Sequence, residues 1–326
     1  MTIAALEGGS ASMTDRTRTL IVAARRPVSA GVVELRLRPG DSAPLDPWTP
    51  GAHVDLILPG DRVRQYSLCG SPGNSDEWRI AVLREPAGRG GSSWIHDHLR
   101  EGERVRVRGP RNHFPLLPLP RYVFLAGGIG ITPILPMIAA AQAAGADWHL
   151  HYGGRSRSTM AFLGSLADHG DRVTLWPQDE VGLMDLESAL PASTADTPVY
   201  CCGPAGLIEA VEARCAQQDG RALHVERFTA AGAVPGQDGS FDVECRASGV
   251  TVTVPAGTSV LDALRAAGLR LLSSCGEGVC GTCETAVLDG EVDHKDSILT
   301  EEEQAAHDTM MICVSRARGE RIVLDL

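Results

Sequence analysis

The sequence predicts a multidomain protein with an antiparallel β-barrel, an α/β domain built on a parallel sheet, and a small acidic C-terminal domain. Three observations support this prediction. The chain has 326 residues, enough for two or three domains. Its pattern changes from short alternating strands to alternating strands and helices, and then to a cysteine-containing loop. Residues 235–326 contain 7 basic and 16 acidic residues, so they hold −9 of the formal charge of −11.

The composition is that of an ordinary globular chain, with 43% hydrophobic and 22% charged residues. This excludes a largely disordered chain, a collagen-like fibre and a disulfide-dense mini-protein. The acidic balance argues against nucleic-acid binding, which usually needs a basic face. No run reaches the ~18 apolar residues of a membrane span, and no secretory signal is visible. We therefore expect a cytoplasmic protein without a membrane partner, whose nine cysteines are thiols or ligands.

The β-rich region is expected over residues 17–116, after a small, polar tail over 1–16 that we expect to be disordered. Apolar residues alternate with polar ones over 32–37, 53–58 and 104–108. A period of two predicts half-buried antiparallel strands, and short strands separated by Gly and Pro favour a small barrel.

The α/β domain is expected over residues 117–229. Strand-like runs at 122–126, 148–152, 173–176 and 199–202 alternate with helical stretches, the first of which reaches Ala144. Such βα units indicate a parallel sheet with helices on both faces. Residues 230–239 are rich in Gly and Pro and predict a linker. The C-terminal domain, 240–326, should contain strands at 241–245 and 250–254, a helix near 259–267, and a capping box of Thr300 and Glu303.

The strongest local signal is a cysteine loop in the C-terminal domain. Cys275, Cys280 and Cys283 have the spacing C-x4-C-x2-C, and Cys313 follows. This is the spacing of plant-type [2Fe–2S] sites, and the interleaved glycines let the backbone wrap closely around a cluster. Zinc also takes four cysteines, although its structural sites usually come as two separated pairs. The segment resembles plant-type ferredoxins, which implies a β-grasp fold and makes these four cysteines the iron ligands.

A glycine turn follows the first strand of the α/β domain. The segment Gly127-Gly128-Ile129-Gly130-Ile131-Thr132-Pro133 leads into a helix, whose free N–H groups favour a dinucleotide pyrophosphate. Pro133 suits a first helical turn, yet it stands where the Rossmann fingerprint has its third glycine. A tight packing turn would look the same in sequence.

Two segments of the β-rich region suit a phosphate and a flat ring. Arg64-Gln65-Tyr66-Ser67 offers a guanidinium and an aromatic face on one strand, although an ordinary barrel edge has the same pattern. Arg89-Gly90-Gly91-Ser92 precedes a helix predicted near 94–99 and makes a second anion site, suited to a single phosphate.

Taken in this order, the motifs resemble the phthalate dioxygenase reductase family, to which vanillate O-demethylase reductase components belong. The resemblance covers nearly the whole chain after residue 16. It implies three cofactors: FMN, a [2Fe–2S] cluster, and NADH more often than NADPH. The implied flavin contacts are Arg64, Gln65, Tyr66, Ser67, Ala81, Leu83, Gly90, Gly91, Ser92 and Phe228. The implied nucleotide contacts are Gly128, Gly130, Ile131, Thr132, Pro133, Arg155, Ser156, Cys202, Gly203 and Pro204. A solvated loop at Arg155 and a plain core aromatic at Phe228 remain alternatives.

The expected function follows from these cofactors. NADH delivers two electrons as a hydride, the cluster accepts one at a time, and a flavin can stand between them. We expect an NADH-dependent reductase that feeds a separate Rieske-type oxygenase for aromatic hydroxylation or O-demethylation, docks it at the acidic C-terminal domain, and uses no catalytic acid or base. A reductase for a haem-thiolate monooxygenase is the alternative. A redox-sensing interaction module is less favoured, because sensing needs no nicotinamide site.

Overall fold

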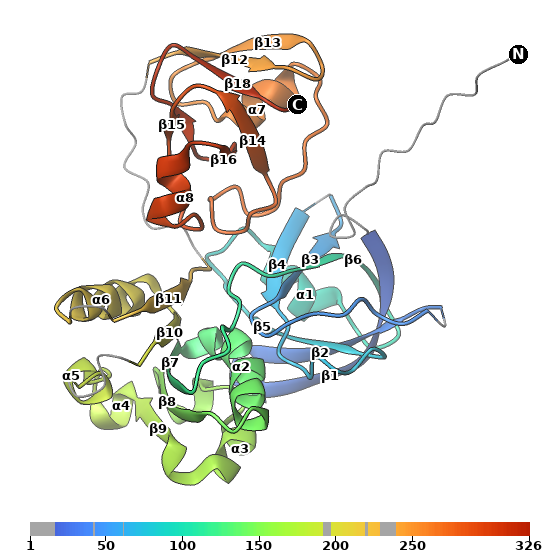
Figure 1. Cartoon of the computed structure of the whole chain (residues 1–326). Coiled ribbons are helices and arrows are strands. Elements are labelled where there is room, and N and C mark those ends of the chain that lie inside the picture. Colours follow the sequence, from blue (N-terminus) through green and yellow to red (C-terminus); the bar gives the residue numbers. More distant parts are fainter. Residues whose placement is uncertain (1–16, 42, 61, 192–196, 219–220, 229–238) are drawn as a thin grey trace, which may run out of the picture.

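The computed structural model describes residues 17–41, 43–60, 62–191, 197–218, 221–228 and 239–326. The tail expected over 1–16 and nearly all of the linker expected over 230–239 lie outside these residues. The described residues form a six-stranded sheet, two five-stranded sheets and a two-stranded ribbon (Figure 1).

The six-stranded sheet is antiparallel, in the order β4-β3-β6-β1-β2-β5. A bridge between Leu68 and Ile80 joins the end of β4 to β5, so the sheet closes into a barrel. The short helix α1 (Gly91–His98) packs against β4 and β5 at this closure. The strands are β1 (Thr17–Ser29), β2 (Val32–Pro39), β3 (His53–Leu58), β4 (Arg62–Ser67), β5 (Trp78–Leu83) and β6 (Arg104–Arg111).

The expected alternation of buried and exposed residues is seen on β6 over 104–107 and fails on β2 and β3. On β2, residues 32–35 are all buried, including Glu34, which pairs with Arg26, Arg36 and Arg79. Five of the six residues of β3 are buried, including Asp55. The prediction that this strand is half-buried is therefore wrong. Its outer face is covered by the C-terminal domain, whose Ser274 hydroxyl donates to Asp55 Oδ1 at 3.1 Å.

The second sheet is parallel, in the order β11-β10-β7-β8-β9. The chain starts at β7, builds outward through β8 and β9, and then returns to the other side of β7 with β10. Two apolar clusters cover the two faces. The strands are β7 (Arg121–Gly127), β8 (Asp147–Gly154), β9 (Val173–Pro177), β10 (Val199–Cys202) and β11 (Leu223–Glu226), the last of which the sequence did not predict. The α-helices are α2 (Ile131–Ala143), α3 (Leu163–Leu166), α4 (Gln178–Val181), α5 (Leu186–Ala189) and α6 (Ala205–Ala216).

The C-terminal sheet is mixed, in the order β13-β12-β18-β14-β16, with β12 and β18 parallel. Ser259 caps α7 and Thr300 opens α8 with Glu303, which confirms the predicted capping box. The elements are β12 (Phe241–Cys245), β13 (Val250–Val254), α7 (Val260–Ala266), β14 (Glu284–Asp289), β15 (Val292–Asp293), α8 (Glu301–Ala306), β16 (Thr309–Met311), β17 (Arg316–Ala317) and β18 (Arg321–Leu324).

The barrel contacts both other sheets. Ala81 of β5 shares an apolar cluster with Tyr122 and Phe124 of β7. On another side, the loop before β14 reaches down onto β3 and β6 (Figure 1). The proposed domain limits at 116, 229 and 240 stay predictions. No helix in the described part of the chain has the length and apolarity that a membrane crossing requires.

Candidate functional site

The four predicted cysteine ligands come together in the loop above the barrel. Their side chains are at most 7% exposed. The Cys275 thiol contacts those of Cys280 and Cys313, and Cys313 also contacts Cys283. The thiol of Cys275 and burial together raise the pKa of Cys280. Four buried thiols are costly to leave without a partner, so the donor set fits a thiolate-ligated metal centre.

The backbone of this loop approaches the sulfurs closely. The Glu277 N–H donates to Cys275 Sγ at 3.2 Å. Gly278 has φ 68°, and a Cβ there would meet Asp296 Cα at 3.0 Å. Gly281 has φ 66°, and a Cβ there would overlap the His113 ring of the barrel. These glycines are therefore required by the fold of the loop and by its contact with the barrel.

A single metal ion and a two-iron cluster require different arrangements of the four cysteines. Within the described residues, no group of three or more Cys, His, Asp and Glu side chains is placed to hold a single ion. In a [2Fe–2S] cluster each iron takes only two cysteines, because sulfides complete its coordination. The absence of a single-ion group is therefore compatible with a two-iron cluster.

The predicted flavin segments meet each other across the closure of the barrel. Arg64 of β4 donates through Nη2 to the Arg89 carbonyl at 2.7 Å, at the start of α1. A Cβ on Gly91 would lie 2.5 Å from Arg64 Nε, so the guanidinium lies directly over the glycine turn. Burial and the neighbouring Arg89 lower the pKa of Arg64. Excess positive charge at a helix N-terminus fits a phosphate.

The same strand carries groups that fit a flavin ring. The amide nitrogen of Gln65 is buried and has no partner among the described residues. Burial raises the pKa of Tyr66, whose ring packs beside the barrel core. The unpartnered amide group of Gln65 indicates a hydrogen-bond acceptor that the described residues do not supply. Of the other residues that the resemblance implied, Ala81 is buried, Leu83 packs against the β7 cluster, and Phe228 is 41% exposed just after β11.

The predicted nucleotide turns lie together where the strand order reverses. The turns after β7 and β10 are neighbours, because β7 and β10 pair. A Cβ on Gly130 would overlap the Cys202 carbonyl oxygen, and one on Gly203 would meet the Gly127 nitrogen at 3.0 Å. Pro133 lies in the first turn of α2. Ligands of open α/β sheets bind at such a reversal point, so the geometry suits a dinucleotide.

The loop after β8 contains the predicted ribose contacts. Ser156 begins a capping box with Thr159, so its hydroxyl is already engaged. Arg157 Nε donates to both carboxyl oxygens of Glu180 at 3.0 Å. Arg155 is exposed. The second strand of a dinucleotide-binding sheet is the usual place where the adenosine ribose is contacted, so the Arg157–Glu180 pair bears on which coenzyme fits.

A buried carboxyl joins the two predicted sites. Glu226, at the end of β11, lies 3.9 Å from Cys202 Sγ. Its carboxyl also lies beside the Ser67 hydroxyl of β4, without a well-formed hydrogen bond. Burial raises the pKa of Glu226 to about 8. The flavin strand and the nicotinamide turn therefore meet around a carboxyl that is largely protonated at neutral pH.

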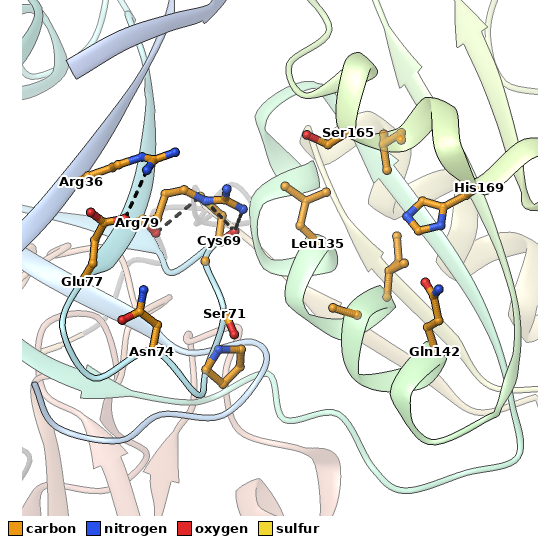
Figure 2. Close-up of a pocket in the computed structure, with 15 residues that line it drawn as sticks. Arg36, Cys69, Ser71, Asn74, Glu77, Arg79, Leu135, Gln142, Ser165 and His169 are labelled. Atoms are coloured by element: carbon orange, nitrogen blue, oxygen red, sulfur yellow. Dashed lines mark hydrogen bonds and ion pairs between the residues drawn. The ribbon is translucent and has the colours of Figure 1, made fainter. Parts of the chain in front are cut away.

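The described residues also line a cavity of about 430 Å³ between the barrel and helix α2 (Figure 2). Arg79 and Glu77 face Leu135 and Gln142 across it. None of the predicted site residues lines it. Burial raises the pKa of Cys69, which also lies there, to about 12, so this thiol is unreactive at neutral pH.

The sequence reasoning missed Glu226, Glu180 and a buried ion cluster around Asp55. Glu226 ends the short segment Leu223–Glu226 and lies two residues before Phe228, so a charge at a strand end was the available signal. Asp55 alternates with apolar residues and looked like an exposed strand position. Its partners Arg108 and Arg111 are 53 or more residues away, which no local pattern reveals.

Comparisons with known proteins agree with this geometry. A model of the 2Fe-2S iron–sulfur cluster binding domain matches residues 243–318. Vanillate O-demethylase oxidoreductase of a Pseudomonas strain is 42% identical over 94% of this chain and 99% of its own length. Phthalate dioxygenase reductase, described as a modular structure for electron transfer from pyridine nucleotides to [2Fe-2S], superposes with a TM-score of 0.70 at 34% identity, covering 95% of this chain and 98% of that one.

A self-sufficient cytochrome P450 monooxygenase of type IV is also similar. It superposes with a TM-score of 0.89 at 46% identity over 95% of this chain. This chain spans 41% of the length of that protein.

Proposed function

Because this chain belongs to the phthalate dioxygenase reductase family, we propose that it carries electrons from NADH through FMN and a [2Fe–2S] cluster to a separate Rieske-type oxygenase. One observation carries the proposal. The barrel contacts the nucleotide-type sheet edge on one side and the cysteine loop on another. A carrier held in the barrel can therefore exchange electrons with both sites. FMN, when bound, supplies this chemistry, because it accepts a hydride and releases electrons singly.

The chain's own residues bind, orient and exclude water. Arg64 and the first turn of α1 would hold the flavin phosphate, and Gln65 with Tyr66 would contact the ring. The paired turns around Gly130 and Cys202 hold the nicotinamide nucleotide. Glu226 keeps its proton at neutral pH, so it adds no buried negative charge between Ser67 of the barrel and the turn at Cys202. We assign no side chain as a general acid or base.

The coenzyme is proposed to be NADH, with NADPH used less well. Both carboxyl oxygens of Glu180 accept from Nε of Arg157, so Glu180 already engages a guanidinium that could otherwise bind a 2′-phosphate. It also adds a negative charge beside the ribose loop, which disfavours a second anion.

The oxygenase is proposed to dock on the acidic C-terminal domain. Helix α8 exposes Glu301 and Glu302, and Leu272 is 45% exposed just before the cysteine loop. The exposed carboxylates of α8 suit a basic partner face, and Leu272 offers exposed apolar surface on the same domain. Coupled turnover with the oxygenase should therefore weaken as salt rises, while NADH–ferricyanide activity changes much less. Equal salt sensitivity of the two activities would argue against docking there.

The test of the proposed function uses the purified full chain. We expect flavin and iron–sulfur absorbance together, and reduction of ferricyanide and cytochrome c by NADH. A protein with neither flavin nor iron absorbance would overturn the proposal. Fast steady-state turnover would also separate a reductase from a redox-sensing module.

A haem-thiolate monooxygenase is the second candidate partner. The similarity to a self-sufficient P450 monooxygenase favours this second partner. The match covers 41% of the length of that P450 protein. Product formation with a Rieske-type oxygenase and with a haem-thiolate monooxygenase, each at equal reductase concentration, decides between them. Higher coupling to the haem enzyme would replace the first proposal.

The site of action is proposed to be the cytoplasm. None of the nine cysteines forms a disulfide bond in this structure, and all nine lie in its described residues. A reducing compartment preserves such thiols and is where structural disulfides are rare.

A further inference from the structure

The segment just before the first cysteine ligand is tied to the barrel. Ser274 Oγ donates to Asp55 Oδ1 at 3.1 Å, and Arg108 Nη2 lies 3.5 Å from the Ser273 carbonyl oxygen. Arg89 donates to the Cys275 carbonyl and lies 3.5 Å from the Glu277 carboxyl. These contacts join residues up to 219 positions apart, so they fix the cysteine loop relative to the barrel.

A second connection reaches a ligand sulfur. The Arg111 side chain is 10% exposed, and its Nη2 lies 2.8 Å from Asp55 Oδ1. The same nitrogen donates to Thr282 Oγ1 at 3.0 Å. Thr282 Oγ1 in turn lies 3.3 Å from Cys280 Sγ. Arg111 of the barrel is therefore connected to Cys280, a predicted iron ligand, through the hydroxyl of Thr282 alone.

Ligation fixes the direction of these hydrogen bonds. A cysteine bound to iron is a thiolate and has no proton to donate. The Thr282 hydroxyl must then donate to Cys280 Sγ, and its oxygen accepts from Arg111. Asp55 holds the guanidinium in place for this, because it is fully buried and paired with both Arg108 and Arg111.

The buried cluster of Asp55, Arg108 and Arg111 beside the loop has more positive than negative charge. Two guanidinium groups share the single carboxylate of Asp55. Nε and Nη1 of Arg111 are buried and find no partner among the described residues. His113, which packs on Gly281, has its pKa lowered by burial and by Arg111, so it is neutral at neutral pH. Reduction adds negative charge to a cluster, so a nearby uncompensated cation favours the reduced form.

We propose that Arg111 of the barrel is a positioning residue for the iron–sulfur cluster, acting through Thr282 on Cys280 and raising the reduction potential of the cluster. The proposal rests on the proposed function only in requiring the cluster at the four cysteines. It makes the flavin-binding barrel part of the surroundings that tune the next electron carrier. The positive charge and the hydrogen bond act in the same direction, because both stabilise added electron density on sulfur.

The experiment compares three variants of the full chain with a matched control. Thr282→Val removes the hydroxyl at nearly constant shape, Arg111→Gln removes the charge, and Arg111→Lys keeps it. Arg104→Gln removes the same charge from an exposed position of the same strand, β6. Each cluster potential is measured by a dye-mediated titration followed by electron paramagnetic resonance.

We expect the ratio of reduced to oxidised cluster at a fixed potential to fall about tenfold in Thr282→Val and in Arg111→Gln, which is about 59 mV for a one-electron couple. The ratio should fall less in Arg111→Lys, and in Arg104→Gln it should equal that of the wild type. In the double variant that combines Arg111→Gln and Thr282→Val, the fold-decrease in this ratio should be smaller than the product of the two single fold-decreases, because the two residues act as a unit. The resonance line shape should change in Thr282→Val, while flavin reduction by NADH stays unchanged.

Unchanged potentials in Thr282→Val and Arg111→Gln would overturn the inference while leaving the relay intact. A shift in Arg104→Gln equal to that in Arg111→Gln would also overturn it, since only net charge would then matter. If Arg111→Gln fails to fold, the reduction potential of the cluster in Thr282→Val tests the inference by itself. A wild-type chain without any cluster signal would instead refute the proposed function.

Discussion

The two contact faces of the barrel differ in the titratable groups that lie where the domains meet. Where Ser67 of the barrel meets the turns of the parallel sheet, these groups are Glu226 and Cys202 of that sheet, and burial favours their uncharged forms. The charged residues Arg79 and Glu77 lie elsewhere on this side, across the cavity from α2. Toward the cysteine loop, the barrel presents a buried cluster of full charges, Asp55 with Arg108 and Arg111. The first face suits a hydride, whose transfer needs two rings in contact. The second suits single electrons, whose driving force depends on the local charge.

The change expected to have the largest effect interrupts electron transfer between the flavin and the final acceptor. Cys280→Ser replaces a thiolate ligand by a weaker one, so transfer to cytochrome c or the oxygenase should be abolished. Flavin reduction by NADH, followed by stopped-flow absorbance, should keep its rate. Loss of flavin reduction in this variant would mean that the two faces are not separable.

Asp55→Asn tests the charged face. It leaves two buried guanidinium groups without their carboxylate, which costs about 3–5 kcal/mol of unfolding free energy. Burial alone would raise the pKa of Asp55, but Arg111 and Arg108 outweigh it and hold the pKa below 3.8. This stabilisation is therefore present above pH 3.8 and is lost as the pH falls through the lowered pKa.

Chemical unfolding and hydrogen exchange of residues 273–282 measure the effect of Asp55→Asn. The control is Asp97→Asn, which breaks the exposed pair with Arg84 and should cost less than about 1 kcal/mol. Equal effects of the two substitutions would show that the Asp55 cluster has no special role.

Gly130→Ala tests the closely packed face. The new Cβ would overlap the Cys202 carbonyl oxygen, so the two nucleotide turns must separate. A displacement of ~1 Å at a reacting site lowers kcat/KM on the order of a hundredfold. Gly206→Ala, which meets no atom within 4 Å, should leave the value for NADH unchanged. A normal kcat/KM in Gly130→Ala would remove these turns from the coenzyme site.

Glu226→Gln tests the uncharged state of the same face. Burial raises the pKa of Glu226 from 4.5 to about 8, so the folded chain keeps a proton that the unfolded chain releases. Its stabilisation is complete below pH 4.5 and is lost as the pH rises through about 8. The variant should flatten the decline in stability between these values, measured by thermal unfolding at several pH values. An unchanged slope would mean that Glu226 is already ionised.

The smallest expected effect concerns the coenzyme. Glu180→Gln frees Arg157 and removes a negative charge, so the kcat/KM for NADPH should rise about fivefold relative to NADH, the scale of an exposed charge pair of ~1 kcal/mol. Binding of adenosine 2′,5′-bisphosphate should strengthen in parallel. A constant NADPH to NADH ratio would place the ribose elsewhere.

The sequence predicted local structure well and contacts between domains poorly. The strands at 53–58, 199–202, 241–245 and 250–254 have the predicted bounds, because alternation and β-branched runs are local signals. The cysteine loop was found from spacing alone, and the four thiols do converge. The burial of β3 and the Arg111–Thr282 contact depend on how the C-terminal domain packs on the barrel, for which no short segment carries information. Glu226 was missed for the same reason.

The central claim is that one chain joins a two-electron donor site to a one-electron carrier. Anaerobic addition of NADH to the purified full chain, followed by absorbance and electron paramagnetic resonance, tests it directly. The flavin bands should bleach first, and a [2Fe–2S] resonance should then grow in as electrons reach the cysteine loop. A chain that contains zinc in place of iron, or one whose flavin is reduced while no cluster signal ever forms, would contradict the claim.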